Sequence, residues 1–155
     1  MRIGHGYDVH RLVDGDGITI GGVLIPCDKR LLAHSDGDVL IHAIADALLG
    51  AASERDIGFH FPDNDNEYKN IDSKILLKRV LDIIKAKGFE IEYIDCTIIA
   101  QTPKMSPYIE KMRSALSCVL EISCDLINVK ATTEEHLGFT GRKEGISAHC
   151  VCLLK

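Results

Sequence analysis

Hydrophobic and polar positions recur along the chain with two different periods. Apolar residues three to four positions apart predict helices from residues 35–38 to Gly50, from Asp72 to about Ala86, and from residues 103–107 to about Leu120. Shorter β-branched or alternating runs predict strands over residues 2–10, 18–26, 89–100, 126–132 and 145–154. Inside 18–26, Gly21 and Gly22 provide the positive φ of a hairpin turn, whereas residues 53–70, rich in Asp and Asn, predict a loop.

The order of these elements predicts an α+β fold with a mostly antiparallel sheet and helices packed on one face. The last strand is apolar on both faces, since Cys150 and Cys152 alternate with Val151 and Leu153. Because the predicted helices cover only one face, we expect a subunit interface to cover the other. A length of 155 residues predicts a single domain over 1–155.

Composition favours a compact protein of the cytoplasm. Hydrophobic residues make up 46% of the chain and charged residues 26%, the proportions of a globular domain. A net charge of −5 without a Lys/Arg cluster argues against nucleic acid as a partner. No apolar run reaches the roughly 18 residues of a spanning helix, and no signal-peptide pattern follows Met1. We therefore expect neither membrane association nor export.

Six cysteines lie in apolar surroundings without CxxC spacing, which is typical of reduced core residues in an intracellular protein. Cys150 and Cys152 share one face of the last strand, so a metal site is the alternative. Core packing is the favoured interpretation, because no third ligand lies at a recognisable spacing.

The candidate metal ligands come from the first strand and the first helix. Asp8 and His10 lie two positions apart, so their side chains point the same way at the end of the strand. Asp38, His42 and Asp46 form a polar stripe on a helix that is otherwise apolar, and such buried groups need partners. Zinc bound by Asp8, His10 and His42, with Asp46 orienting an imidazole, satisfies both elements. The alternative is a hydrogen-bonded Asp–His pair beside an unrelated core histidine.

Three further segments have polar groups suited to phosphates or sugars. His34 and Ser35 lie at a predicted helix start, which favours an anion, although Ser35 could equally be an N-cap in a capping box with Asp38. The acidic loop from Asp63 lacks the glycine and glutamate of a calcium loop, so it is a solvated loop or a site for sugar hydroxyls. Residues 132–135 form a capping box for a short helix ending at Gly138, or a diphosphate site with Glu135 on Mg²⁺.

Six segments in this order, spread over nearly the whole chain, resemble the 2-C-methyl-D-erythritol 2,4-cyclodiphosphate synthase family of the non-mevalonate isoprenoid pathway. They are GHGYDVH, LLAHSDGDVLIHAIADALLGAA, DIGFHFPD, IIAQTPKM, NVKATTEE and LGFTGRKEGI. The resemblance implies a homotrimer whose sheets face the trimer interior, with active sites at the subunit boundaries. It also implies conversion of 4-diphosphocytidyl-2-C-methyl-D-erythritol 2-phosphate into the cyclic diphosphate and CMP, by in-line attack of the 2-phosphate on the β-phosphate.

By the same resemblance, zinc binds Asp8, His10 and His42, a second divalent cation, Mg²⁺ or Mn²⁺, binds Glu135, and His34 and Thr133 polarise the reacting phosphates. The implied substrate-binding residues are Ser35, Asp56, Ile57, Gly58, Phe61, Asp63, Asp65, Ala100, Lys104, Met105, Ser106, Thr132, Thr133, Glu134, Glu135, Phe139 and Arg142. Residues 100–106 form the cytosine pocket of the neighbouring subunit, and Phe139 and Arg142 lie near a central cavity that binds isoprenoid diphosphates. The implied location is the bacterial cytoplasm, or the plastid stroma for a chain trimmed from a longer precursor.

Two positions depart from the family pattern. Glu134 stands where a third threonine is common and adds negative charge beside the diphosphate, and Ser106 replaces an apolar residue in the cytosine segment. Both bear on affinity and metal preference rather than on reaction type. Two other functions remain as alternatives: a metal-dependent phosphohydrolase with the same three ligands, and a non-catalytic trimer that binds nucleotide or isoprenoid diphosphate.

Overall fold

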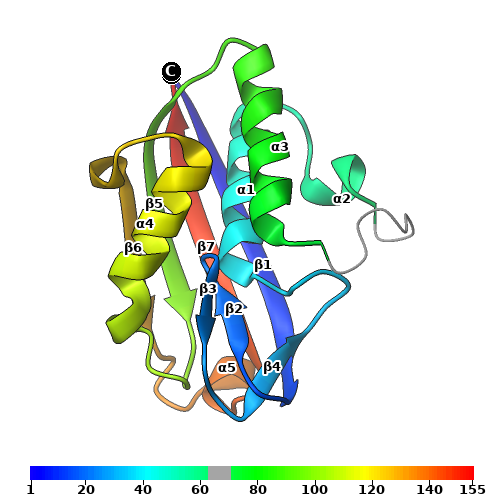
Figure 1. Ribbon diagram of the computed structural model, residues 1–155, viewed down its shortest axis with the longest axis vertical. Helices are drawn as coiled ribbons and strands as arrows, with labels where there is room; N and C mark the ends of the chain where they lie inside the picture. Colours follow the sequence, from blue (N-terminus) through cyan, green and yellow to red (C-terminus); the bar gives the residue numbers. More distant parts are fainter. Residues whose placement is uncertain (63–70) are drawn as a thin grey trace.

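The computed structural model describes residues 1–62 and 71–155 (Figure 1). The strands are β1 (Arg2–Asp14), β2 (Ile18–Ile20), β3 (Val23–Ile25), β4 (Lys29–Leu32), β5 (Ile91–Ile99), β6 (Ile127–Thr132) and β7 (Gly145–Leu154). The helices are α1 (Val39–Ala51), α2 (Ile57–His60), α3 (Ser73–Ala86), α4 (Ile109–Leu120) and α5 (Gly138–Gly141), with short 3-10 helices at Ser106–Tyr108 and Cys124–Leu126. No helix in the described residues is long and apolar enough to cross a membrane.

The main sheet has the strand order β4-β1-β7-β5-β6. The pairs β1–β4, β1–β7 and β5–β7 are antiparallel, whereas β5–β6 is parallel, so the sheet is mixed. Figure 1 shows α1, α3 and α4 on the same side of this sheet, and β2–β3 forms a separate hairpin. The predicted α+β class is therefore confirmed. The hairpin is also confirmed, because Gly21 and Gly22 have φ values of 60° and 73°.

Two glycines let α1 pack unusually close to β1. A Cβ atom on Gly4 would lie 1.9 Å from the carbonyl oxygen of Ala47, and a Cβ on Gly6 would lie 1.9 Å from that of Ala43. Any larger residue would push the helix away from the strand. This close approach brings the side chains that follow on β1, Asp8 and His10, within reach of the same helix.

Asp38 connects the start of α1 to the β2–β3 hairpin. Its Oδ1 accepts hydrogen bonds from the backbone N–H groups of Gly21 (2.8 Å) and Ile41 (3.0 Å), and its Oδ2 accepts one from Gly22 (2.7 Å). Asp38 is thus the N-cap itself, and the alternative of Ser35 as the cap was wrong. Complete burial raises the pKa of the Asp38 carboxyl to about 6, although the three backbone donors oppose that effect.

Several predicted boundaries were wrong. The first strand continues to Asp14, where it pairs with β4, a strand that was not predicted, and α2 lies inside the predicted loop. The short helix predicted from the 132–135 capping box is absent from these positions. Glu135 and His136 have φ values of 52° and 65°, which a right-handed helix excludes, so α5 begins only at Gly138.

The sheet face opposite α1 carries a row of exposed apolar side chains. Ile3 is 74% exposed, Val151 46% and Tyr7 43%, whereas the other face of β7 is buried.

Cys96, Cys150 and Cys152 are buried, as predicted, but Cys118 is exposed on α4. A side-chain hydrogen bond with Cys96, together with burial, raises the pKa of the Cys150 thiol, and burial raises the pKa of the Cys152 thiol to about 11, so these two thiols are protonated core residues.

Candidate functional site

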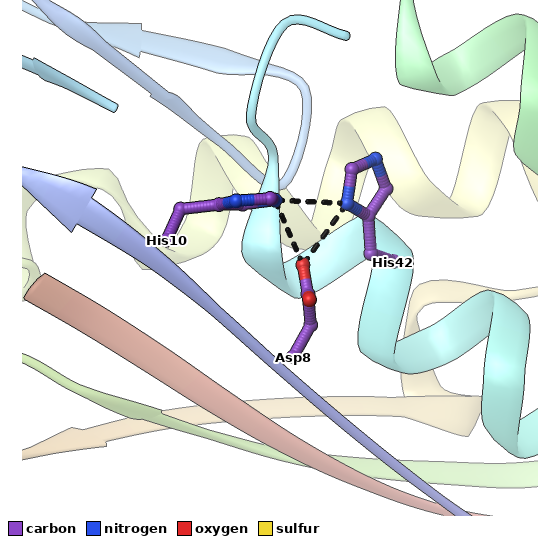
Figure 2. A group of neighbouring side chains, drawn as sticks. All are labelled: Asp8, His10 and His42. Atoms are coloured by element: carbon purple, nitrogen blue, oxygen red, sulfur yellow. Dashed lines mark hydrogen bonds and ion pairs between the residues drawn. The ribbon is translucent and has the colours of Figure 1, made fainter. Parts of the chain in front are cut away.

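Asp8, His10 and His42 converge at the middle of β1 and the start of α1 (Figure 2). The Nε2 atom of His10 and the Nδ1 atom of His42 each lie 3.0 Å from Oδ2 of Asp8. The two nitrogens lie 3.3 Å from each other. The predicted cluster is therefore assembled from two elements, with His10 and His42 lying 32 residues apart in sequence.

These separations suit one small tetrahedral cation. Nitrogen and oxygen ligands at about 2.0–2.1 Å from zinc in a tetrahedron lie about 3.3–3.4 Å from each other. The three atoms of the cluster approach this triangle, and three protein ligands leave a fourth position for a substrate oxygen. The donor set of two imidazoles and a carboxylate also fits zinc better than magnesium or calcium.

The charge state of the cluster favours a cation as well. Burial alone would raise the pKa of Asp8, but the hydrogen bonds and charges of His10 and His42 outweigh it and lower that pKa to about 2. Burial lowers the pKa of His42, yet the hydrogen bond and charge of Asp8 reverse this and raise it overall. The site thus holds an anionic carboxylate, which favours a cation, whereas the raised pKa of His42 means that a proton competes for its ring nitrogen.

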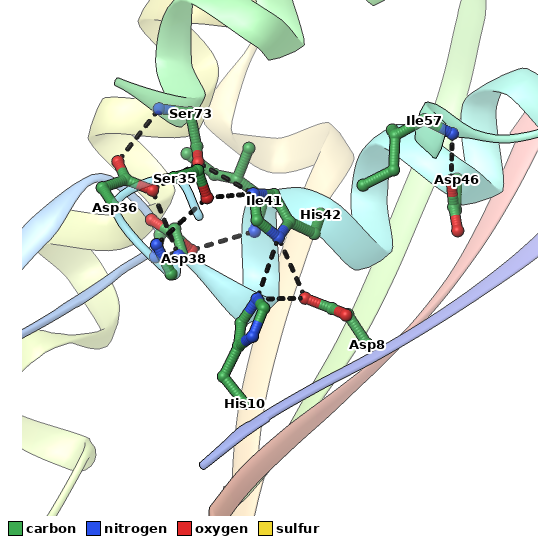
Figure 3. A network of polar contacts seen from close by, with 12 residues as sticks. Asp8, His10, Ser35, Asp36, Asp38, Ile41, His42, Asp46, Ile57 and Ser73 are labelled. Carbon is green, nitrogen blue, oxygen red and sulfur yellow. Dashed lines mark hydrogen bonds and ion pairs between the residues drawn. The ribbon is translucent and has the colours of Figure 1, made fainter. Parts of the chain in front are cut away.

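His42 is oriented by Ser73 and Asp36 rather than by Asp46 (Figure 3). Nε2 of His42 lies 3.0 Å from the Ser73 hydroxyl and 3.3 Å from that of Ser35, and the Ser73 hydroxyl in turn makes a short hydrogen bond to Oδ1 of Asp36. The Ser73 hydroxyl donates to that carboxylate and accepts from Nε2–H. This arrangement leaves the Nδ1 lone pair of His42 directed toward Asp8 and His10.

Asp46 instead positions the α2 segment. Its Oδ1 accepts a hydrogen bond from the backbone N–H of Ile57 at 2.8 Å, so the predicted contact with an imidazole was wrong. The Asp56 side chain caps α2 by accepting from the N–H of Phe59 at 2.9 Å. The three side chains of the polar stripe on α1 therefore have different roles: Asp38 binds the β2–β3 hairpin, His42 joins the Asp8 cluster, and Asp46 binds the start of α2.

One pocket opens directly over the three ligands. Its lining brings together predicted residues from four segments: Asp8, His10, His34, Ser35, His42, Ile57, Gly58 and Phe61. Ile71 and Leu76 also line it and were not predicted. Asp56 is an exposed residue adjacent to this lining, and Asp63 and Asp65 lie outside the described residues.

A second pocket gathers the other predicted segments. It is lined by Ala100, Gln101, Pro103, Lys104, Met105, Ser106, Ala131, Thr132 and Thr133. Within the described residues, this pocket and the first have no lining residue in common. The predicted site residues of a single chain therefore form two separate groups.

The remaining predicted residues lie around the second group or beyond it. The Thr133 hydroxyl accepts a hydrogen bond from the backbone N–H of Glu135 at 3.3 Å and donates one to Oε1 of the Glu135 carboxylate at 3.5 Å, and Glu135 is exposed. Glu134 makes a short hydrogen bond with the buried hydroxyl of Thr140, so its carboxylate is directed toward α5. Phe139 lines a shallow pocket with His10, whereas Arg142 pairs with Glu144 at 2.9 Å.

Sequence reasoning missed Ser73 and Asp36 as residues of the site. Ser73 is fully buried at the first position of α3, and Asp36 accepts its backbone N–H at 2.9 Å. The available signal was a serine directly after the N-cap Asp72. Whether this serine contacts His42 depends, however, on how α3 packs against α1. Local pattern does not contain that information.

Comparison with known proteins gives matches over the whole chain, including the residues of both pockets. A model of the YgbB family matches residues 1–155. A protein named 2-C-methyl-D-erythritol 2,4-cyclodiphosphate synthase from Pseudomonas putida (strain W619) is 61% identical over 154 residues, which are 99% of this chain and 98% of that protein. The protein of that name from Azotobacter vinelandii is 57% identical over the same shares.

Solved structures of proteins named IspDF and IspF are also similar to this chain over 99% of its length. The structure of the bifunctional IspDF from Campylobacter jejuni is 44% identical, with a TM-score of 0.96 over 99% of this chain, which spans only 42% of that one. A CDP complex of IspF from Plasmodium falciparum is 38% identical with a TM-score of 0.87, over 99% of this chain and 94% of that one. From its full-length match to the family and its high identity to these relatives, the chain belongs to the YgbB family of 2-C-methyl-D-erythritol 2,4-cyclodiphosphate synthases.

Proposed function

We propose that this chain converts 4-diphosphocytidyl-2-C-methyl-D-erythritol 2-phosphate into 2-C-methyl-D-erythritol 2,4-cyclodiphosphate and CMP. The observation that carries the proposal is the Asp8–His10–His42 cluster, whose three ligand atoms face a pocket that His34 and Ser35 also line. The names of the full-length relatives agree with it. Their bacterial origin supports the cytoplasm as the location.

The reaction needs positioning more than proton transfer. An oxygen of the 2-phosphate, already anionic, forms a bond to the β-phosphorus, and the bond from that phosphorus to the bridging oxygen breaks, so that CMP leaves with the electron pair. Asp8, His10 and His42 would hold zinc, which when bound acts as a Lewis acid on a phosphate oxygen. We assign His34 to the reacting phosphates, Ser35 to the methylerythritol moiety, and Asp56 and Gly58 to the ribose.

We further propose a homotrimer in which each active site joins the two pockets of different subunits. The separation of the pockets within one chain supports this, because a cytidyl substrate must reach both the metal ligands and the 100–106 segment. The exposed apolar row on the outer sheet face supports an interface there. In that assembly Thr132–Glu135 bind the diphosphate, Glu135 holds Mg²⁺ or Mn²⁺, and Phe139 and Arg142 contact an isoprenoid diphosphate in the central cavity.

Product analysis tests the reaction against hydrolysis. The purified protein is incubated with the cytidyl substrate and Mg²⁺, and CMP and cyclic diphosphate are followed by mass. We expect equal amounts of both products, and their loss in His42→Ala but not in Cys118→Ser, an exposed position on α4. An open-chain product with free phosphate would instead identify the phosphohydrolase, and binding without turnover would identify a sensor.

A further inference from the structure

Two histidines form a pair on the outer face of the sheet, away from the pocket described above. His5 on β1 and His149 on β7 are both exposed, and Nε2 of His5 lies 3.2 Å from Nδ1 of His149. Along β1, His5 has the opposite side-chain direction from Asp8, because odd and even positions of a strand face different sides. The pair is therefore separated from the Asp8 cluster by the sheet itself.

The geometry of this pair matches that of the histidines in the Asp8 cluster. There too an Nε2 atom faces an Nδ1 atom, His10 and His42, at a separation of 3.3 Å. Two ring nitrogens at this distance can bind one ion as a chelate. We propose that His5 and His149 form a second metal site, for divalent transition ions such as Zn²⁺, Ni²⁺ or Cu²⁺.

The surroundings of the pair support a preformed site. The Tyr7 ring lies directly opposite His149 on β1 and contacts it at a tilt of 49°, with ring centroids 4.8 Å apart, so the imidazole packs against an aromatic neighbour. Because the pair offers two imidazoles and no carboxylate, it favours transition ions over Mg²⁺ or Ca²⁺. Both side chains are exposed in the single chain. In the trimer proposed above this face turns toward the interior, so the remaining positions of the ion would be filled there by water or by the same pair of a neighbouring subunit.

Zinc stoichiometry distinguishes this site from the first one. The wild-type protein, His149→Ala, His42→Ala and the double variant are dialysed against the same buffered zinc concentration, and bound metal is measured by atomic emission. We expect each single variant to bind less zinc than wild type, and the double variant to lose the sum of the two amounts. Retention of the full wild-type zinc by His149→Ala would show that the rings are joined only by a hydrogen bond.

Two further variants separate ligation from structural damage. Tyr7→Phe keeps the aromatic ring beside His149, so its zinc content should equal that of wild type. His5→Asn removes the other ligand from a different strand and should reproduce the loss seen in His149→Ala, with the oligomeric state measured on the same samples. Normal zinc content in His5→Asn would overturn the proposal. The proposed function is tested separately, by the loss of cyclodiphosphate formation in His42→Ala. Failure of the second metal site is therefore distinguishable from failure of the proposed function.

Discussion

At His42, both ring nitrogens have assigned partners, and this determines which one can bind a metal. Nδ1 faces Asp8 at 3.0 Å, whereas Nε2 faces the hydroxyl of Ser73 at 3.0 Å. Because the Ser73 hydroxyl is itself engaged by Asp36, it accepts the Nε2 proton and fixes the tautomer. Ser73 on α3 therefore orients the imidazole of His42 on α1 so that Nδ1 is free to bind a metal.

Removing that hydroxyl should weaken zinc binding without unfolding the protein. We expect Ser73→Ala to raise the zinc dissociation constant about 10- to 100-fold, the range typical for partners that orient a metal-bound histidine. Ser114→Ala, which removes an exposed hydroxyl bonded to its own helix, is the control. Competition with a chromophoric chelator measures both constants, and circular dichroism checks the fold. Equal affinities in the two variants would contradict the orienting role.

The proton competes with the metal for Nδ1 of His42. Although burial opposes the charged form, the Asp8 hydrogen bond and charge raise the pKa of His42 above 6.5. In the metal-free protein, the stability gained from this pair is fully present between pH 3.8 and 6.5. It is lost as the pH rises through the raised pKa of His42 or falls through the Asp8 pKa of about 2. NMR titration of the metal-free protein should give a midpoint above 6.5, and Asp8→Asn should lower it. A midpoint unchanged by Asp8→Asn would exclude the carboxylate as the cause.

Among the elements, the contact between β1 and α1 determines whether the ligands meet. Gly4 and Gly6 allow the helix backbone to approach the strand, and three residues of the cluster then come within hydrogen-bonding distance. The sequence predicted both elements and the ligands on them from periodicity alone. It could not predict the packing distance between them, which depends on the absence of two side chains.

A methyl group at Gly6 should disturb the fold and the site together. The Cβ atom would meet the Ala43 carbonyl oxygen at 1.9 Å, so we expect Gly6→Ala to lower the free energy of unfolding by about 1–3 kcal/mol or more and to weaken zinc binding. Gly50→Ala is the matched control, since its nearest foreign atom would be 4.0 Å away and alanine favours helix by up to about 1 kcal/mol. Urea denaturation compares the two. A Gly6→Ala protein as stable as Gly50→Ala would contradict close packing here.

The elements that sequence reasoning missed are short and lack a period of their own. α2 and α5 have four residues each, and β4 is defined by its pairing with the end of β1. In the 133–137 segment, capping residues were present, but positive φ at Glu135 and His136 replaced the helix by a turn. Long amphipathic helices such as α3 and α4 were predicted well because an entire face of each is buried.

At the scale of the whole molecule, the two separate pockets and the exposed outer sheet face both bear on whether one active site is built from two subunits. Each chain has the candidate metal ligands in one pocket and the 100–106 segment with Thr133 in another. Sequence pattern found both groups, yet it contains no information on which chain contributes each group to a site. Only an experiment that mixes chains can answer this directly.

Subunit mixing provides that experiment. His42→Ala disables the metal half and Thr133→Ala the other half, so each variant alone should be inactive. If every site joins halves from neighbouring chains of a closed ring, equal mixing with random assembly should restore about a quarter of wild-type activity, because one pairing in four joins two intact halves. Unfolding and refolding the variants together exchanges the subunits, and a refolded mixture of wild type with itself gives the reference. Sites contained within one chain would leave the mixture inactive, since every chain would then carry a defective half.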